Sequence, residues 1–418
     1  MNSKLILIGG KSGSGKTTLI NKLIEMYPDV YLRPISYTTR KQRPEETNNE
    51  YIFISSEQFF DLSEKGEILN IDKVYGNYYG MRRDFILENL KDGILLIKEI
   101  HPQNHKKINQ LLKDNVISIL LKSQPIKSTR NDEDAEYYNS ICEDDFDIIF
   151  YNDHGASIEK NAEYLHNKIS TYLRYCDAFP RTGFVDYINR VGYNKVAKYF
   201  TEEKRITTRN FHELSASFFK KFFYDYVKAD SKVLEIGPGQ GWLYEVVTPT
   251  CEQYCFADIS KEMSNINGST SKIITSVRCI PYPAESFDVI VCSLGDPYFY
   301  PEAICELFRL LKSGGYLAFS LPAKQWASLL RGSASKGDKT IFVLDSGETA
   351  EVFSFTYSID ELIKLMGDIG LQLVSANSIK AGLLTNEISS AITIAAEKGC
   401  IDYKDLETVT VAIFYKED

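Results

Sequence analysis

The sequence lacks an excess of basic residues, because its 48 lysines and arginines are outnumbered by 57 aspartates and glutamates, which gives a net charge of −9. Binding long nucleic acid requires a basic face that neutralises phosphates, so this composition argues against such a partner and leaves small nucleotides compatible. No segment approaches the roughly 18 apolar residues of a membrane span, and the first apolar run is too short for a signal peptide. We therefore expect a cytoplasmic protein that binds neither membranes nor long nucleic acid.

The sequence also lacks closely spaced cysteine pairs, internal repeats and low-complexity tracts. Of its eight cysteines only Cys251 and Cys255 lie close together, without the second pair or nearby histidines that a zinc site needs. We interpret the cysteines as small core residues in a reducing compartment. A chain of 418 residues that is 44% hydrophobic is long enough for two or three cores, at about 100 to 200 residues per domain.

A glycine-rich segment follows the short apolar run at residues 5–8 and precedes a helical pattern of apolar residues. Residues 10–17 read GKSGSGKT, which is the pattern of a P-loop. The glycines let backbone N–H groups turn toward a polyphosphate, and the positive end of the helix dipole adds to this attraction. We expect Lys16 to reach the outer phosphates of ATP and the Thr17 hydroxyl to bind Mg²⁺; the alternative is a glycine-rich turn that matches by chance. The predicted ATP-binding residues are Gly10, Ser12, Gly13, Ser14, Gly15, Lys16, Thr17 and Thr18.

The motifs that follow the P-loop resemble those of guanylate kinases, and the resemblance covers about residues 1–173. It is carried by residues 36–44 (SYTTRKQRP), by Tyr51 and by residues 76–80 (GNYYG). Guanidinium groups and phenolic hydroxyls can hold the dianionic phosphate of a nucleoside monophosphate against the incoming phosphoryl group. The alternative is that the two arginines form a solvated basic turn. The resemblance implies that Arg40, Arg43, Tyr51 and Tyr78 hold the acceptor phosphate.

Asn70 stands where the resemblance places a glutamate that accepts hydrogen bonds from two guanine N–H groups. An amide offers one acceptor and one donor group in place of two acceptors. A site built for paired hydrogen bonds rejects an unmatched partner, so a pyrimidine, adenine or modified base is allowed in place of guanine. Ser36 is kept, and we expect it to contact a base oxygen or amine.

Two further departures concern catalysis. The family's Asp-x-Asp is replaced by residues 97–99 (IKE), in which only Glu99 keeps an acidic group for the acceptor site. The lid region at residues 122–138 is short and carries Arg130 as its single arginine, although one arginine can be worth about 10³-fold in the rate of phosphoryl transfer. Arg82 and Arg83 either substitute for the lid or are surface charges. The predicted catalytic residues of this half are Lys16, Arg40 and Arg130.

A second glycine-rich loop, residues 237–241 (GPGQG), follows the strand-like run at residues 232–236. No Gly-Lys-Ser/Thr follows it, and the next strand-like run ends at Asp258, where an acidic partner for ribose hydroxyls belongs. With Glu235 and residues 280–290 and 310–317, the loop resembles class I S-adenosylmethionine-dependent methyltransferases; a nicotinamide-binding module is the alternative. The resemblance implies S-adenosylmethionine binding by Glu235, Gly237, Gly239, Gly241, Asp258, Ile259 and Ser293.

Residues 295–299 (GDPYF) follow the next strand-like run and resemble the Asn/Asp-Pro-Pro-Tyr segment of amino-methyltransferases, with one proline missing. The resemblance implies that Asp296 accepts a hydrogen bond from an amine while Tyr298 stacks on it. The alternative is a loop that simply closes the pocket. The acid that the family usually offers to the adenine amine is replaced here by residues 275–278 (TSVR). The contact with the adenine amine is therefore either made by the backbone or weakened.

The domain boundary is predicted after the helical pattern of residues 158–175, because Pro180 and Gly183 interrupt it. We predict a first domain at residues 1–175, a linker at 176–184 and a second domain at 185–418, with a helical cap at 185–230. Within the cap, His212 is either a base above the site or a residue of the helix surface. Phe218, Phe219, Phe222, Phe223 and Tyr226 give one broad apolar helix face.

The sequence thus predicts an α/β protein, with a P-loop nucleoside monophosphate kinase-like domain followed by a Rossmann-like class I methyltransferase domain. The expected cofactors are ATP, Mg²⁺ and S-adenosylmethionine, and the expected partner is a small nucleotide or nucleotide-derived substrate. The competing interpretation is a nucleotide-sensing domain attached to a methyltransferase. A homo-oligomer is compatible with the sequence.

Overall fold

The computed structural model describes residues 4–44, 50–74, 76–90, 94–124, 141–197, 205–251, 253–263, 271–332, 339–344 and 346–417. The chain divides between Ile169 and Ser170 into two compact units, and each unit is a mixed α/β structure. The predicted fold class is therefore confirmed.

The first unit is built on a parallel five-stranded sheet in the order β2-β7-β1-β8-β9. The central strand β1 is entirely buried, as expected for a short apolar run with helices on both faces. Ile86 of α3 and Ile108 of α4 pack with Leu5 and Leu7 of β1 in one core cluster. The strands of this sheet are β1 (Leu5–Gly10), β2 (Tyr31–Leu32), β7 (Leu95–Glu99), β8 (Val116–Ser123) and β9 (Ile148–Asn152).

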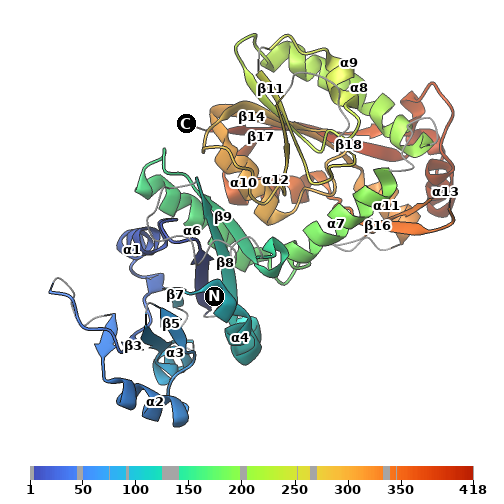
Figure 1. Cartoon of the computed structure of the whole chain (residues 1–418). Coiled ribbons are helices and arrows are strands. Elements are labelled where there is room, and N and C mark those ends of the chain that lie inside the picture. The colour runs from blue at the N-terminus through green and yellow to red at the C-terminus, as the bar shows by residue number, and fades with distance from the viewer. Residues whose placement is uncertain are drawn as a thin grey trace. The chain divides into compact units, whose positions relative to one another are not determined.

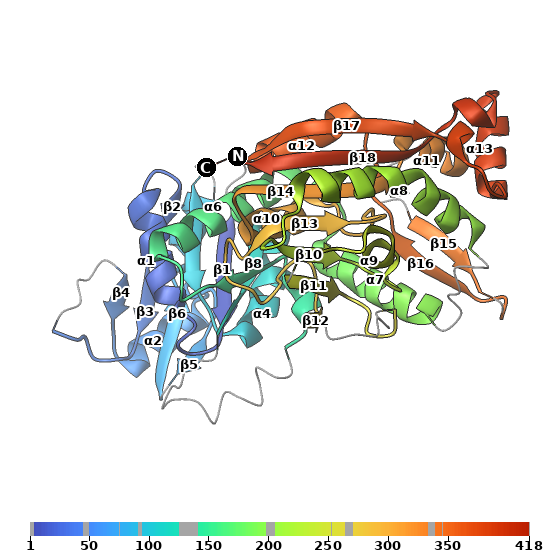
Figure 2. The ribbon, with the colours of Figure 1, turned by 90° about the horizontal axis from the view of Figure 1, so that it is seen from above.

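A smaller sheet in the order β4-β3-β6-β5 completes the first unit and lies beside α2 in Figures 1 and 2. Strand β3 pairs in parallel with β4 and antiparallel with β6, so this sheet brings Ser36 level with Tyr51. Its strands are β3 (Ser36–Thr38), β4 (Tyr51–Phe53), β5 (Asp72–Val74) and β6 (Asn77–Met81). The helices of this unit are α1 (Lys16–Met26), α2 (Ser56–Glu64), α3 (Arg83–Asn89), α4 (Pro102–Leu112) and α6 (Ile158–Tyr175), and its 3₁₀ turns are Lys113–Asn115 and Glu143–Asp145. The last residues of α6 belong to the second unit.

The second unit contains a seven-stranded sheet in the order β12-β11-β10-β13-β14-β18-β17. Six strands run in the same direction, and β18 runs antiparallel to both of its neighbours. Because the strand order reverses next to β10, loops on either side of the reversal can open a crevice at the carboxyl ends of the strands. The strands are β10 (Lys232–Ile236), β11 (Gln253–Asp258), β12 (Ser271–Ile274), β13 (Phe287–Cys292), β14 (Leu311–Pro322), β17 (Leu371–Lys380) and β18 (Glu407–Lys416).

Helices cover both faces of this sheet, with α8 and α9 on one side and α10 and α12 on the other (Figure 1). The predicted aromatic face of α8 is confirmed, because Phe219, Phe222 and Phe223 are buried against β10, β11 and β13. The helices are α7 (Thr182–Ala197), α8 (Ile206–Tyr226), α9 (Trp242–Val247), α10 (Pro301–Leu310), α11 (Lys324–Arg331), α12 (Ile359–Ile369) and α13 (Ser390–Gly399), with 3₁₀ turns at Ala381–Leu383 and Tyr403–Asp405.

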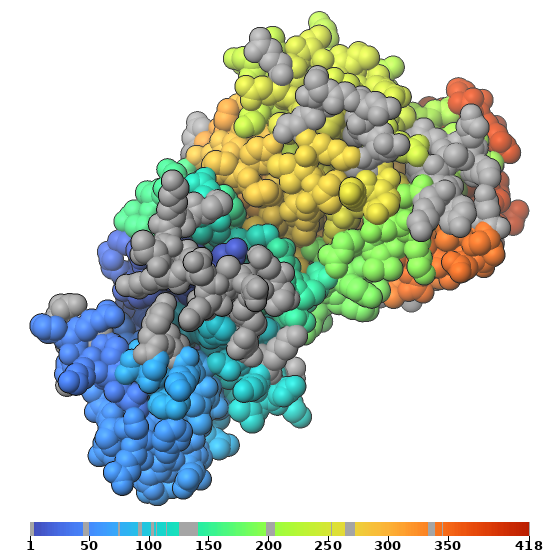
Figure 3. Space-filling model, in the orientation of Figure 1, coloured from blue at the N-terminus to red at the C-terminus, as the bar shows by residue number. Residues whose placement is uncertain are grey.

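Helix α7 packs against a hairpin made by β15 (Lys339–Val343) and β16 (Thr349–Phe353), and Figure 3 shows the green helix beside the orange hairpin at the surface. The close approach requires a glycine, because a Cβ at Gly192 would lie 2.2 Å from the Glu351 carbonyl oxygen. On the other side of α7, Asp186 forms a buried ion pair with Arg278 at 2.7 Å and accepts from the Tyr300 hydroxyl. Arg278 therefore anchors α7, which explains a basic residue in the segment where the sequence lacks the usual acid.

Candidate functional sites

The P-loop connects β1 to α1, and Gly15 at the start of the helix has a left-handed backbone with φ of 87°. A Cβ there would meet the Asn152 amide at 2.5 Å, so only glycine fits. The Asn152 amide donates to the Ser14 carbonyl oxygen from β9 and holds the loop in place. The Lys16 ammonium donates to the carbonyl oxygens of Gly10 and Lys11 at 2.6 and 2.7 Å.

The first turn of α1 faces solvent at Thr17 and Thr18, and no side chain caps it in the part of the chain that the structure describes. Uncapped N–H groups at a helix start, together with an ammonium held over a glycine loop, fit the phosphates of a nucleotide. Thr17, for which the P-loop pattern predicts a bond to Mg²⁺, is exposed in this turn. All eight predicted ATP-binding residues therefore belong to β1, the loop and the first turn of α1.

The predicted acceptor residues gather on the small sheet. The Arg40 guanidinium lies 5.5 Å from the centre of the Tyr51 ring and 5.3 Å from that of Phe53. Tyr78 is tied to the segment before Arg40, because its N–H donates to the Thr39 hydroxyl and its carbonyl oxygen accepts from the Thr39 N–H. Arg43 is exposed in the following turn. The structure thus places Arg40, Tyr51 and Tyr78 on neighbouring strands or turns of one sheet.

Glu99 is engaged in an ion pair that the sequence analysis missed. The Arg33 guanidinium, which is 7% exposed, lies 2.7 Å from the Glu99 carboxylate and also contacts Glu50 and the Asn21 amide. Burial opposes the ionisation of Glu99, but Lys98 and Arg33 outweigh it and hold the pKa of Glu99 below its usual value. Glu99 is therefore an ionised carboxylate that already forms an ion pair with Arg33.

Asn70 is also bound within the protein. Its side-chain oxygen accepts from the Met81 N–H at 3.0 Å, and its amide group donates to the Asp72 carboxylate at 3.0 Å. Asp72 accepts a further hydrogen bond from the Asn104 amide, and burial raises the pKa of Asp72 to about 6. Asn70 therefore links β5 to β6, a role that the sequence analysis did not foresee.

The arginines proposed for phosphoryl transfer are not all described. Arg130 and most of the predicted lid lie outside the described residues. Arg82 forms an ion pair with the neighbouring Asp84 at 2.6 Å, and the Arg83 guanidinium donates to the Gly66 carbonyl oxygen. These contacts favour the interpretation of Arg82 and Arg83 as surface charges.

The second glycine loop follows β10, and Gly237, Gly239 and Gly241 have left-handed φ angles of 62°, 56° and 89°. A Cβ at Gly237 would lie 2.3 Å from the Tyr298 ring, so the loop passes directly over this tyrosine. Asp258, the last residue of β11, accepts from the N–H groups of Ser260 and Gly239 at 2.8 and 3.4 Å. Burial raises the pKa of Asp258 to about 6.

Glu235 is fully buried and accepts from the Tyr254 hydroxyl at 2.7 Å. Burial raises the pKa of Glu235 to about 8, so its carboxyl holds a proton near neutral pH. The Ser293 hydroxyl, just after β13, is buried and has no hydrogen-bond partner in the described part of the chain. Ile259 is buried next to Asp258. These residues lie at the carboxyl ends of β10, β11 and β13, where the reversal of strand order predicts a crevice.

A cavity of about 540 Å³ occupies this crevice. Among the predicted residues, it is lined by Glu235, Gly237, Gly239, Asp258, Ser293, Asp296 and Tyr298, whereas Gly241 and Ile259 are not among its lining residues. The cavity can hold a nucleoside-like cofactor, because a carboxylate, a glycine loop and an unsatisfied serine hydroxyl face it together.

Asp296 and Tyr298 meet in this cavity from one loop. Burial raises the pKa of the Asp296 carboxyl to about 6, although Ser354 and Arg331 favour its ionised form. The Pro297 carbonyl oxygen, which would face an amine in the amino-methyltransferase interpretation, accepts from the Asn189 amide at 3.0 Å. The Pro297 carbonyl oxygen is thus engaged within the chain, whereas the Asp296 carboxyl lines the cavity.

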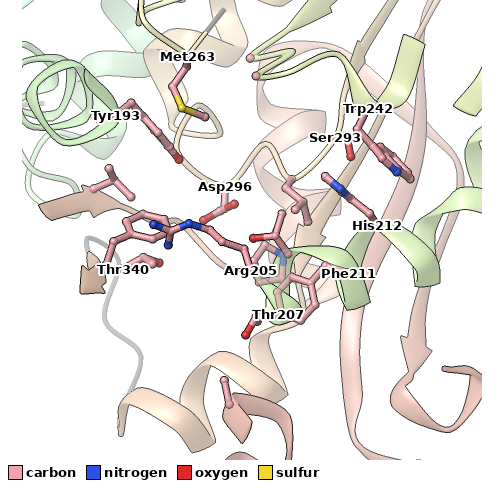
Figure 4. Close-up of a pocket in the computed structure, with 18 of the residues that line it drawn as sticks. Tyr193, Arg205, Thr207, Phe211, His212, Trp242, Met263, Ser293, Asp296 and Thr340 are labelled. Carbon is pink, nitrogen blue, oxygen red and sulfur yellow. The ribbon is translucent and has the colours of Figure 1, made fainter. Parts of the chain in front are cut away.

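Three residues that the sequence analysis missed or left open complete the cavity (Figure 4). His212 stacks on Trp242 with ring centroids 4.0 Å apart, so it lies at the cavity wall and not on the helix surface. Arg205 precedes α8 and lies over the Phe342 ring at 4.7 Å. Arg331 ends α11 and donates to the hydroxyls of Thr340 and Ser354. Figure 4 shows Arg205 and Asp296 among the labelled residues that line the cavity.

The comparisons with known proteins agree with this division. A family model described as guanylate kinase matches residues 2–168, and one described as methyltransferase domain matches residues 206–376. The guanylate kinase of Wolbachia pipientis wMel is 32% identical over 175 residues, which are 38% of this chain and 85% of that protein. The guanylate kinase of Trichormus variabilis is 42% identical over 100 residues, which are 24% of this chain and 50% of that protein.

Solved structures match each part separately. A guanylate kinase from Anaplasma phagocytophilum has a TM-score of 0.35 and 27% identity, and the match covers 40% of this chain and 85% of that one. A SAM-dependent methyltransferase from Methanosarcina mazei has a TM-score of 0.34 and 17% identity, with 47% and 97% covered. Within the described residues, no helix is long and apolar enough to cross a membrane.

Proposed function

This chain belongs to the guanylate kinase family through its first unit and carries a methyltransferase domain in its second. We propose that it is a bifunctional nucleotide-metabolising transferase. One activity phosphorylates a nucleoside monophosphate-like acceptor at the expense of ATP. The other methylates a small molecule derived from a nucleotide. ATP with Mg²⁺ supplies the phosphoryl group, and S-adenosylmethionine supplies an electrophilic methyl group.

In the first unit, Lys16 would exchange its two loop carbonyl partners for phosphate oxygens. The uncapped start of α1 would bind further phosphate oxygens, and Thr17 would hold the metal ion. Arg40, with Tyr51 and Tyr78, would position the acceptor phosphate, so catalysis rests on alignment and on neutralising charge.

In the second unit, Asp258 would accept from ribose hydroxyls of the cofactor, and the glycine loop would approach it closely. Asp296 is placed to accept a hydrogen bond or a proton from the attacking nucleophile, and its raised pKa near 6 suits proton transfer near neutral pH. The aromatic walls of His212, Trp242 and Phe342 exclude water from the transfer.

The observation that carries the proposal for methylation is the presence of two guanidinium groups in the same cavity as the glycine loop and Asp258. Arg205 and Arg331 line it together with the carboxyl groups of Glu235, Asp258 and Asp296. Guanidinium groups bind phosphates well, so a phosphorylated acceptor is favoured over an uncharged one.

The test is mass spectrometry of methyl transfer from S-adenosylmethionine to matched pairs of nucleosides and nucleotides. We expect methylation of a nucleotide to exceed that of its nucleoside, and Arg205→Met to reduce the nucleotide reaction selectively. Equal methylation of both members of every pair would contradict a phosphorylated acceptor. Arg209→Met, on the next turn of α8 and outside the cavity lining, is the matched control.

A nucleotide-sensing first unit is the competing function, and the short lid and the replacement of Asp-x-Asp by residues 97–99 (IKE) favour it. A coupled assay of ADP release over nucleoside monophosphates separates the two. Turnover that depends on an acceptor and disappears in Lys16→Ala supports the kinase, whereas nucleotide binding without turnover supports the sensor.

We propose the cytoplasm as the compartment in which the chain works. All eight cysteines are free thiols, as a reducing compartment maintains. The expected partners are small nucleotides, in keeping with the net negative charge of the chain.

A further inference from the structure

Lys98 in β7 carries a buried ammonium group that has no hydrogen-bond partner in the described part of the chain. The residue is 6% exposed, and its Nζ atom lies 4.5 Å from the centre of the Tyr51 ring. Burying a cation without a pairing or hydrogen-bonding partner costs free energy. In agreement, burial lowers the pKa of Lys98, although Glu99 opposes this shift.

The charged groups around Lys98 are engaged with other partners. Glu99 and Glu50 pair with Arg33, and Asp72 accepts from the amides of Asn70 and Asn104. The ring of Tyr51 offers Lys98 a cation–π contact, which leaves its N–H donors without an acceptor. Lys98 therefore presents donors that an acceptor atom of a ligand can satisfy.

Ser36 supplies a second unsatisfied group beside the same tyrosine. Its hydroxyl is buried without a hydrogen-bond partner among the described residues, and Ser36 lies directly opposite Tyr51 in the pairing of β3 with β4. A hydroxyl can donate or accept, whereas an ammonium only donates. The pair Lys98 and Ser36 thus matches a carbonyl oxygen next to a ring N–H.

The neighbourhood has few acceptors left for a second donor of a ligand. The Asn70 oxygen already accepts from the Met81 N–H, both carboxylate oxygens of Asp72 accept from asparagine amides, and one carboxylate oxygen of Glu99 contacts Arg33. A base with an exocyclic amino group would therefore bury that amino group without an equivalent partner. Leaving one buried donor unsatisfied lowers affinity by about 10-fold or more.

We propose that Lys98 and Ser36 read the base of the acceptor nucleotide, and that this base is of the dioxo class, with carbonyl oxygens on both sides of a ring N–H. Uracil, thymine and xanthine have this edge, whereas guanine, adenine and cytosine carry an amino group on it. In the complex, Lys98 donates to one carbonyl oxygen and Ser36 accepts from the ring N–H. The inference rests on the proposed function of the first unit as a site for a nucleoside monophosphate.

Two ligand pairs test the inference, because one member of each pair carries an oxygen where the other carries an amino group, an exchange that also places a proton on the neighbouring ring nitrogen. Xanthosine monophosphate differs from GMP by an oxygen in place of the amino group, and UMP differs from CMP in the same way. Calorimetric titration of the full chain should show the oxo member of each pair binding at least about 10-fold more tightly. Tighter binding of GMP or CMP by the wild type would overturn the inference without any variant.

The variant Lys98→Met keeps the length and apolar stem of the side chain and removes its donors. We expect it to lose at least about 10-fold in affinity for the oxo ligands while ATP still binds, which also shows that the unit is folded. Lys65→Met is the matched control, because Lys65 in the same unit is exposed and paired with Asp61. Retention of the oxo preference in Lys98→Met would remove Lys98 from the base site.

Measurement of ADP release with the same ligands separates the inference from the proposed function. Preferential binding of the oxo ligands without their phosphorylation would overturn the kinase and support the base assignment. Phosphorylation with a preference for GMP would support the kinase and overturn the base assignment. Failure of every monophosphate to bind would overturn both.

Discussion

The close packing of the second glycine loop on Tyr298 leads to a prediction with an internal control. Gly237 and Gly239 have nearly the same left-handed backbone, with φ of 62° and 56°. An added Cβ at Gly237 would lie 2.3 Å from the Tyr298 ring, whereas at Gly239 the nearest atom would be the Met263 methyl group at 3.9 Å. Substitution by alanine therefore imposes the same backbone strain at both sites and a steric clash at only one.

The magnitudes follow from these two terms. A left-handed conformation costs an alanine roughly 1 to 2 kcal/mol, and the stiffer unfolded chain offsets about 0.4 to 1 kcal/mol of this. Gly239→Ala should therefore lower the free energy of unfolding by about 1 kcal/mol. Forcing a ring to move in a packed interior costs about 1 to 3 kcal/mol more, so Gly237→Ala should lower it by about 2 to 4 kcal/mol.

The assay combines urea unfolding of the second unit within the full chain with calorimetric titration of S-adenosylmethionine. Gly237→Ala should also weaken cofactor binding more than Gly239→Ala, because the displaced Tyr298 ring would enter the cavity. Tyr298→Ala in the Gly237→Ala background should recover part of the lost binding. Equal losses in the two alanine variants would refute the packing of the loop on Tyr298.

Three further predictions concern single charged groups. Lys16→Ala should depress phosphoryl transfer by orders of magnitude while methyl transfer persists, and unchanged ADP release in this variant would contradict the P-loop assignment. Asp258→Ala should weaken S-adenosylmethionine binding by about 10- to 150-fold. The affinity of the wild type should fall below pH 6, where Asp258 takes up a proton, and calorimetric titration of the wild type, Asp258→Ala and Asp258→Asn from pH 5 to 8 checks this. In the folded protein Glu235 has a pKa of about 8, above its usual value, so the folded state binds more protons than the unfolded state between about pH 4.5 and 8. The free energy of unfolding should therefore fall as pH rises through this window, by at most about 1.4 kcal/mol per pH unit. Glu235→Gln, which keeps an acceptor for Tyr254, should flatten that slope in thermal melts, and an unchanged slope would place the titration elsewhere.

The parts of both sites that could be predicted from the sequence are those made by consecutive residues. Lys16, Thr17 and Gly237 lie in short segments that connect a strand to the next helix through a glycine loop. The local geometry of such a segment fixes their positions. Asp258 could be predicted for the same reason, because it ends the next strand of the same unit. Their identification required no knowledge of long-range packing.

The parts that could not be predicted depend on contacts between distant segments. Arg33 pairs with Glu99 across 66 residues, and Asn70 is held by Met81 and Asp72, so neither Glu99 nor Asn70 is as available as its motif suggested. Arg205 and Arg331 reach one cavity from the ends of two separate helices. No periodicity or spacing marks such residues, because their roles arise only when the sheet and the hairpin are assembled.

Basic side chains lie on the proposed substrate side of each unit. On the cofactor side, glycine loops and Asp258 provide backbone donors and a carboxylate, which suit groups common to many nucleotides. On the substrate side, Lys98 in one unit has donors without a partner among the described residues, and Arg205 and Arg331 line the cavity of the other unit. A nucleotide with a dioxo base would supply an acceptor for Lys98, and its phosphate is a group that guanidinium side chains bind well. Selection by both units therefore converges on one chemical class, which is the physical reason to expect that they act on related molecules.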